Sequence, residues 1–315
     1  MKTALSLILK VIALTIILFI CFAVAGGVVG QQGSSQTPEQ AGAAAAALLA
    51  VCFLNTIVLT HIILRSRWTG WRLIATVFFV FYGVMTFMSQ IESAVFVTSL
   101  PSGMLPRLFL MGALIAAPFV VLAVLILGKS KADIANTEPN LRLVMPTREW
   151  AWKLAVIAIA YLILYFTFGY FIAWQNPAVR EYYGGIDEGS FLAHMGTVLG
   201  NTFWLIPFQI LRAMLWVAIA LPVIRMMKGR WQETALALGL LFAVLMNAQL
   251  LLPNPFMPEA VRMTHLIETA SSNFIWGFFI GWLLTQRHEF AKVPIAQNKG
   301  AGRVASIGGQ PLDSS

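Results

Sequence analysis

The chain has 315 residues, of which 59% are apolar and only 11% are charged, and its mean hydropathy is +0.79. Soluble domains carry about 25% charged residues, so the composition argues against a soluble enzyme. The net charge of +8 would suit a nucleic-acid partner, but the cations stand at the ends of apolar runs and not on one basic face. They indicate membrane topology and attraction to anionic lipid head groups at the cytoplasmic face, and no nucleic-acid partner is expected.

Eight apolar stretches follow one another along the chain. A spanning helix needs about 20 mostly apolar residues, because the hydrocarbon core of a bilayer is about 30 Å thick. The predicted fold class is therefore all-α, a polytopic transmembrane helix bundle with eight spans. These spans are predicted at residues 8–30, 42–64, 73–97, 107–128, 151–174, 201–224, 233–252 and 263–285.

The positive charges alternate between the two sides of this predicted bundle. Of the 21 Lys and Arg residues, 17 lie in the amino end, the tail and every second loop. Arg107, Arg180 and Arg262 fall on the opposite side, and Arg212 falls inside the sixth span. Cytoplasmic loops carry the excess of Lys and Arg, so both termini are predicted to be cytoplasmic. We expect a multi-pass protein of the cell membrane, and specifically of a bacterial inner membrane.

The predicted organisation is one membrane domain over residues 1–287 and a disordered cytoplasmic tail over 288–315, which is rich in Gly and Ser. The first span ends in an Ala-Val-Ala sequence typical of signal-peptide cleavage, but the apolar run continues and a retained helix is expected. Faint internal similarity suggests a 4+4 parallel pseudo-repeat with halves 1–128 and 150–287. Chance similarity among apolar helices is the competing explanation.

The largest segment on the outer side, residues 175–200, is predicted to contain a short helix. From Gly189 to Ile224 the chain has 36 residues, about 54 Å as a helix, which is too long for one straight span. We expect an interfacial helix at 188–198, a break near Gly200, and then the sixth span.

Polar residues inside the spans are costly in a bilayer and are functional candidates by default. Most of them fall in the outer half of the predicted bundle, which suggests a shared pocket there. The ligand-binding or proton-linked candidates are Gln90, Glu92, Arg212, Asn247, Gln249, His265 and Glu268.

Arg212 is the most demanding of these residues. A guanidinium stays charged at any accessible pH, so near the middle of a span it needs an acid or an anionic ligand. Pairing with Glu92 or Glu268 is the simpler expectation, and recognition of an anionic substrate or lipid head group is the alternative.

A metal site is a second interpretation of the same residues. His265 and Glu268 are three residues apart and share one helix face. With Glu92 and His194 they would offer a zinc-like divalent ion four nitrogen and oxygen ligands of the kind that zinc accepts. A hydrogen-bonded helix interface without a ligand explains the pattern as well.

Two functions of different class remain, and the sequence leaves open whether the protein is an enzyme. The first is a permease-like protein that binds a small polar or anionic solute or a lipid head group in the outer half of the bundle, with protonation of a carboxylate as the coupling event. The second is a membrane-embedded, metal-dependent hydrolase or transferase at the periplasmic face, where the ion would activate a water. A non-catalytic membrane assembly partner is the third alternative.

Overall fold

The computed structural model describes residues 2–29, 37–97, 100–131 and 142–286, and within these ranges every regular element is a helix. The predicted tail at 288–315 lies outside them. In chain order the elements are α1 (Lys2–Val29), α2 (Pro38–Leu64), α3 (Gly70–Tyr82), η1 (Gly83–Met88), α4 (Ser89–Phe96), α5 (Met104–Ile126), α6 (Thr147–Phe168), η2 (Gly169–Ala173), α7 (Pro177–Tyr183), α8 (Phe191–Asn201), α9 (Leu205–Met226), α10 (Trp231–Asn247), η3 (Ala248–Leu251) and α11 (Glu259–Thr285).

Seven helical segments of the described chain are long and apolar enough to cross a membrane, so the protein is a multi-pass membrane protein. They are Ala4–Val29, Pro38–Leu64, Gly70–Phe96, Met104–Ile126, Thr147–Ala173, Leu205–Met226 and Trp231–Leu251. They match the first seven predicted spans. The eighth predicted span corresponds to α11, which has 27 residues but carries Arg262, His265 and Glu268 in its first half and Asn273 just past its middle. Because of these polar residues, α11 is not among the seven apolar segments. That α11 crosses the membrane stays a prediction, and so does the 4+4 pseudo-repeat.

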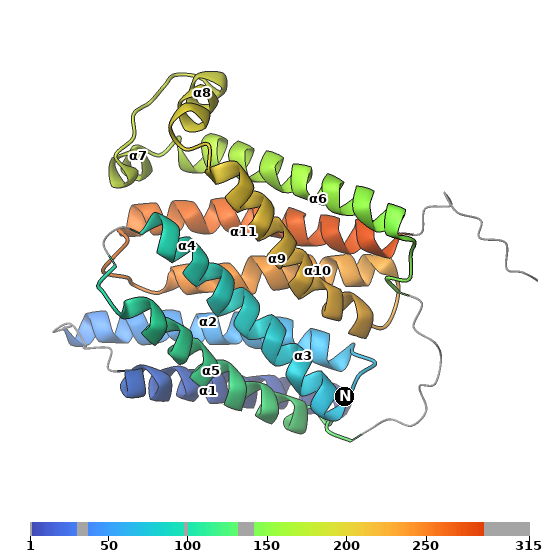
Figure 1. Ribbon diagram of the computed structural model, residues 1–315. Coiled ribbons are helices and arrows are strands. Elements are labelled where there is room, and N and C mark those ends of the chain that lie inside the picture. The colour runs from blue at the N-terminus through green and yellow to red at the C-terminus, as the bar shows by residue number, and fades with distance from the viewer. Residues whose placement is uncertain (1, 30–36, 98–99, 132–141, 287–315) are drawn as a thin grey trace, which may run out of the picture.

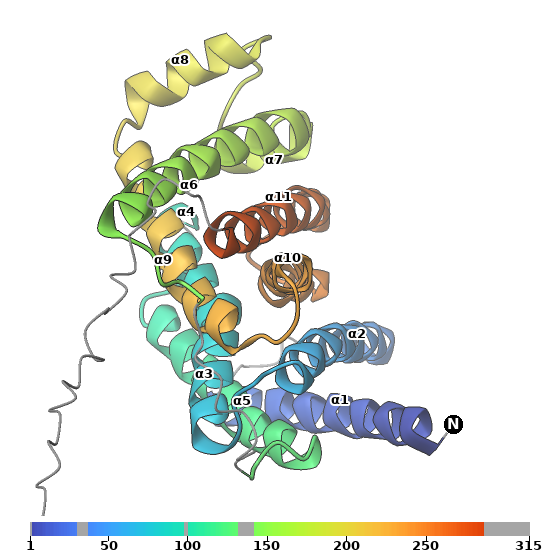
Figure 2. The ribbon, with the colours of Figure 1, turned by 90° about the vertical axis from the view of Figure 1, so that its right-hand side faces the viewer.

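The long helices form two layers (Figures 1 and 2). Figure 2 shows α6, α11, α10, α2 and α1 following one another on one side, and α9, α3, α4 and α5 on the other. Helices α7 and α8 lie at one end of the bundle, beyond α6. Elements distant in sequence, such as α2 and α10, thus become neighbours inside one layer.

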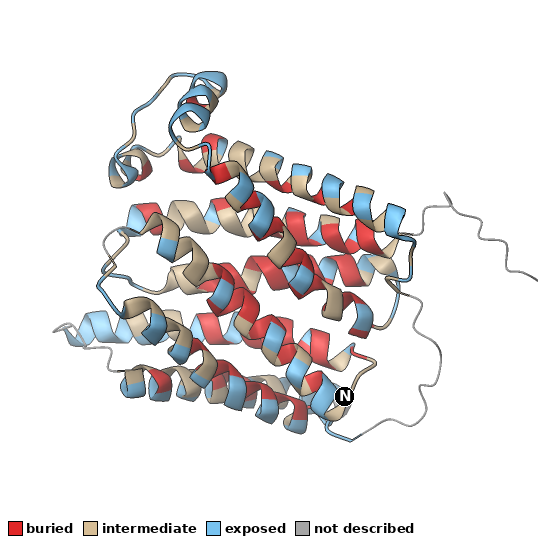
Figure 3. Ribbon diagram, in the orientation of Figure 1, coloured by how far each residue is buried: buried red, intermediate tan, exposed pale blue. Residues whose placement is uncertain are grey.

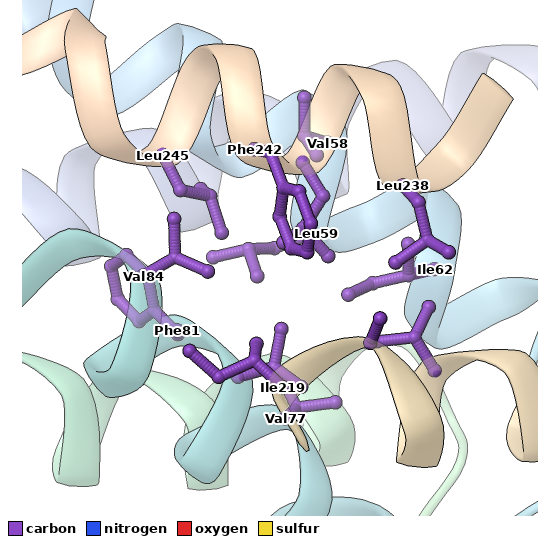
Figure 4. Packing of buried hydrophobic residues seen from close by; sticks show 14 of the residues in the cluster. Val58, Leu59, Ile62, Val77, Phe81, Val84, Ile219, Leu238, Phe242 and Leu245 are labelled. Carbon is purple, nitrogen blue, oxygen red and sulfur yellow. The ribbon is translucent and has the colours of Figure 1, made fainter. Parts of the chain in front are cut away.

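A dry apolar core joins the two layers. Figure 4 shows Leu59 and Phe242 of one layer facing Phe81 and Ile219 of the other, and each of these side chains is almost fully buried. Figure 3 shows that buried residues gather in the middle of the bundle, whereas the helix ends near α7 are only partly covered. The polar residues of the predicted pocket belong to this less densely covered end.

The cation-rich loops meet at the opposite end, where they are joined by hydrogen bonds. The backbone N–H of Arg67 donates to Met226 O at 2.7 Å, and the N–H of Lys228 donates to Arg65 O at 2.7 Å. Arg142 adds a bond to Ile224 O at 3.0 Å. The predicted alternation of charge therefore corresponds to one physical end of the bundle. Which side of the membrane that end faces is a separate question.

The short outer helix expected at 188–198 is present as α8, displaced by three residues. Ser190 caps it by accepting a hydrogen bond from Ala193 N at 3.2 Å, as a serine N-cap commonly does. The chain then breaks after Asn201, and α9 begins at Leu205. The further helix α7 was not predicted, because its seven residues are too few to show an apolar period.

Helices α10 and α11 pack most closely, along a seam of glycines. A Cβ on Gly281 would lie 2.5 Å from Ala235 Cα, and one on Gly239 would lie 2.9 Å from Phe274 O. Gly277 meets the backbone of Leu238 in the same way. Small residues allow this approach of two helices in a membrane, so the seam fixes how the polar face of α11 is presented.

Replacing Gly281 by alanine should therefore destabilise the protein. The added methyl group meets backbone and not a flexible side chain, and overpacking of this kind costs about 1–3 kcal/mol. The matched control is Gly196→Ala in α8, where a Cβ meets nothing within 4 Å and alanine should be neutral or stabilising. Equilibrium unfolding in mixed micelles measures both changes, and equal effects would refute the seam.

Candidate functional site

A small polar pocket lies between α4, α6, α9 and α11. Its volume is about 40 Å³, enough for roughly two or three water molecules, since one water needs about 10–15 Å³. The charged groups on its wall are Glu92, Arg212 and Glu268. The complete lining is Glu92, Tyr161, Leu164, Tyr165, Phe168, Arg212, Glu268, Thr269, Ser272, Asn273 and Trp276.

The predicted pairing of Arg212 with an intramembrane acid is confirmed, and its partner is Glu92. Arg212 is 2% exposed, and its Nη2 donates to Glu92 Oε1. Its Nη1 donates to Gln209 Oε1 at 2.9 Å, and the ring of Tyr161 lies 5.9 Å from the guanidinium carbon. A carboxylate, an amide and an aromatic face thus stabilise the buried charge.

A second polar chain reaches the pocket from α7. His265 Nδ1 lies 2.6 Å from Glu268 Oε2, and the hydroxyl of Tyr183 lies 3.1 Å from His265 Nε2. Tyr183 is 39% exposed, whereas Glu268 is only 9% exposed and lines the pocket. The structure therefore connects the surface at α7 to the pocket wall through three side chains in series.

The pocket has more hydrogen-bond donors than the protein itself satisfies. Arg212 Nε and Trp276 Nε1 are buried and have no acceptor among the residues that the structure describes, and both residues line the pocket. Gln209 Nε2, one turn from Arg212 on the same face of α9, is also buried without an acceptor among the described residues. A buried donor without a partner costs about 1–3 kcal/mol, so these groups are suited to an acceptor that arrives from outside.

Both segments next to the pocket contain π-helical turns. Segment η1 (Gly83–Met88) directly precedes α4, which carries Glu92, and η2 (Gly169–Ala173) follows Phe168 on the pocket wall. A Cβ on Gly169 would lie 3.7 Å from Glu268 Oε1. π-Turns occur frequently at functional sites, and each of these adjoins a helix that lines the pocket.

Three other predicted candidates lie outside the pocket lining. Asn247 donates to Ala243 O at 2.8 Å and accepts from Thr269 at 2.5 Å. Gln249 donates to Ser89 Oγ at 2.7 Å and thereby ties η3 to α4. The Oε1 atom of Gln90 is buried without a donor among the described residues. Asn247 and Gln249 hold helices together, and Asn247 also contacts the pocket wall through Thr269.

The four predicted metal ligands do not all meet. Glu92 and Glu268 line one pocket and His265 contacts Glu268, but His194 lies apart from them. His194 lies on α8, where its Nδ1 is 3.1 Å from Glu188 Oε2, and Trp174 Nε1 donates to the same carboxylate at 3.1 Å. Within the described part of the chain, no three His, Cys, Asp or Glu residues form a group that could hold a metal ion. His194 is separated from His265, Glu268 and Glu92 because α8 lies outside the bundle and supplies its own carboxylate partner.

The Glu188 carboxylate is held ionised by this outer cluster. Burial by itself raises the pKa of Glu188, but hydrogen bonds from His194 and Trp174 outweigh it, and the net pKa lies below its ordinary value. The cluster ties α8 to the loop before it.

Sequence reasoning missed the aromatic part of the site. Tyr161 and Tyr165 on α6 and Trp276 on α11 line the pocket, and the rings of Tyr161 and Trp276 are 4.8 Å apart. Such residues in apolar runs look like ordinary packing. The sequence did offer one signal, the spacing of Gln209, Arg212 and Trp216. These residues are three and four positions apart and therefore form one polar stripe along α9.

Neither a family model, nor a curated protein, nor a solved structure matches this chain.

Removing the acid of the pocket ion pair should destabilise the protein. Glu92→Gln leaves the Arg212 charge buried without its counter-ion, which we expect to cost about 1–3 kcal/mol. The matched control is Glu233→Gln, which removes the acid of the exposed Arg65–Glu233 pair at the other end. That change should cost about 1 kcal/mol or less. Unfolding in mixed micelles compares the two variants, and a larger loss for Glu233→Gln would contradict the assignment.

Proposed function

We propose that this membrane protein is permease-like and binds a small polar solute in the pocket between α4, α6, α9 and α11. The observation that carries the proposal is the pair of buried N–H groups, Arg212 Nε and Trp276 Nε1, that line the pocket without acceptors among the described residues. They favour a solute with several hydrogen-bond acceptors, such as a carboxylate or phosphate group.

The charges on the wall decide when such a solute binds. Arg212 contributes one positive charge, and Glu92 and Glu268 contribute two negative charges when both are ionised. An anionic solute is repelled in that state, and neutralising one carboxylate makes its binding favourable. The pocket holds only a few waters in the described conformation, so solute entry requires the helices around it to separate. This requirement suits a permease, whose site opens to one side at a time.

We further infer that α11 is the eighth span and that both termini are cytoplasmic. On α11, Glu268 and Asn273 line the pocket, and His265 contacts Glu268. Arg262 donates to the carbonyls of Leu250 and Leu252, so these polar groups have protein partners in place of lipid. Figure 1 shows α11 running beside α10 and α6. The cation-rich end would then lie against the anionic lipid heads of the cytoplasmic face, as in a bacterial inner membrane.

Cysteine labelling in intact cells tests this orientation. In a chain with Cys21 and Cys52 replaced by alanine, Ser130→Cys at the cation-rich end and Glu181→Cys on α7 each provide one exposed thiol. A membrane-impermeant maleimide should label position 181 from outside, and position 130 only after the cells are broken. The reverse pattern would overturn the orientation.

Protection of a pocket thiol tests solute binding. Ser272→Cys in the same cysteine-free chain places a thiol on the pocket wall. Methyl methanethiosulfonate should modify it. When Glu268→Gln is added to keep that position neutral, acetate or inorganic phosphate should slow the reaction, whereas neutral acetamide should not. A probe with a Kd of about 1 mM, present at ten times that concentration, slows modification about tenfold.

Two variants calibrate this experiment. Arg212→Gln should abolish the protection, because it removes the Nε donor, whereas Arg65→Gln at the other end should retain it. An unreactive thiol at position 272, or protection that survives Arg212→Gln, would refute the proposed site. Thermal melting of each purified variant identifies those that fail to fold, and Arg212→Lys then replaces Arg212→Gln, since it keeps the charge but lacks the Nε–H in that place.

A further inference from the structure

The side chains of Tyr183, His265 and Glu268 form a hydrogen-bonded series that begins at the surface and ends at the pocket. The separations are 3.1 Å from the Tyr183 hydroxyl to His265 Nε2 and 2.6 Å from His265 Nδ1 to Glu268 Oε2. Both lie within the range in which a proton passes along a hydrogen bond. The three residues come from two elements, α7 and α11, so this arrangement does not arise from helix periodicity alone.

We propose that this series carries protons between the outer solution and Glu268. The inference rests on the proposed function, because it assigns proton coupling to the same pocket. Partial burial raises the pKa of Tyr183, so its phenol is protonated and donates to His265 Nε2. The Nδ1–H of the neutral imidazole then donates to the ionised carboxylate of Glu268.

The transfer conserves protons and charge. The Tyr183 hydroxyl bond breaks as a new N–H bond forms at His265 Nε2, while the Nδ1–H bond breaks and its proton forms a new O–H bond on Glu268. Water at the exposed Tyr183 oxygen supplies the replacement proton. The result is one proton taken from solution, a neutral Glu268 and an imidazole protonated at Nε2 in place of Nδ1. The reverse sequence returns the proton.

The surroundings of Glu268 define what else acts on its charge. On α11 the neighbours are His265 and, one turn before it, Arg262, which is engaged with the carbonyls of Leu250 and Leu252. Arg212 of α9, Glu92 of α4 and the phenols of Tyr161 and Tyr165 of α6 share the pocket. The described parts of η2, η3 and α10 bring no further charged side chain to this end. Helix α7 brings Glu181 and Arg180, and Arg180 donates to Trp174 O and pairs with Asp187. Glu92 and Arg212 neutralise each other, so Glu268 determines the net charge of the pocket.

Protonation of Glu268 therefore prepares the pocket for an acceptor-rich solute. With both carboxylates ionised, the pocket carries a net charge of −1, and with Glu268 neutral the net charge is zero. An anionic solute and a proton would then favour each other's binding by the same factor, as linkage requires. The proton reaches Glu268 through the Tyr183 series, so it does not use the path by which the solute enters the pocket.

Time-resolved infrared spectroscopy after a pH jump tests the route without any solute. In the full-length protein in lipid nanodiscs, protonation of Glu268 appears as a carboxylic acid C=O band, and Glu268→Gln should remove that band. Tyr183→Phe removes one hydroxyl and keeps the ring, and we expect it to slow the appearance of the band by about 100-fold, the low end of the contribution of a positioned proton-transfer group. The final amplitude of the band should be unchanged.

The adjacent tyrosine provides a matched control. Tyr182→Phe makes the same change one residue earlier, where the hydroxyl donates to Phe256 O at 2.8 Å, and it should leave the rate unchanged. An undiminished rate in Tyr183→Phe, equal slowing in Tyr182→Phe, or a band that survives Glu268→Gln would each overturn the relay. If Glu268→Gln fails to fold, ¹³C labelling of the Glu carboxylates shows whether the band belongs to a glutamic acid, because the label shifts only glutamic acid bands. Glu92→Gln then shows whether the band belongs to Glu92. These outcomes are independent of thiol protection at position 272, so the relay can fail while solute binding stands.

Discussion

The buried guanidinium of Arg212 is the constraint on which the outer half of this protein depends. A permanent charge that is 2% exposed inside a membrane bundle is tolerated only where other groups replace water around it. Glu92, Gln209 and the ring of Tyr161 do so together. Because these groups come from α4, α9 and α6, satisfying one charge forces three helices to converge. The pocket is the space at this convergence that side chains leave unfilled.

The two ends of the bundle are held together by different interactions. At the cation-rich end, backbone hydrogen bonds join the loops around Arg67 and Lys228, and in the middle of the bundle an apolar core packs Phe81 against residues of the other layer (Figure 4). At the α7 end the helices are less covered (Figure 3), and polar side chains replace apolar packing. The glycine seam between α10 and α11 links the two ends, because it holds α11 against α10 while the polar half of α11 reaches the pocket.

Much of the fold was predictable because its signals are local. Apolar run length located the first seven spans, and the excess length after Gly189 predicted α8 and the break before α9. The pairing of Arg212 with an intramembrane acid was also predictable, because very few acids lie at the right depth to neutralise it. The glycine seam and α7 were not predicted, since one depends on how two helices are rotated and the other is too short to show a period.

The sequence by itself determined that this is a multi-pass membrane protein with scarce polar groups concentrated toward one end, because the cost of burying polarity in a bilayer is a property of composition and depth. Only the tertiary structure decided which of these groups meet. It placed Tyr183 beside His265, sent His194 to Glu188 outside the bundle, and made Asn247 and Gln249 ties between helices. The physical reason is that partner choice depends on the rotation and register of each helix, and these are set by packing between residues far apart in the chain.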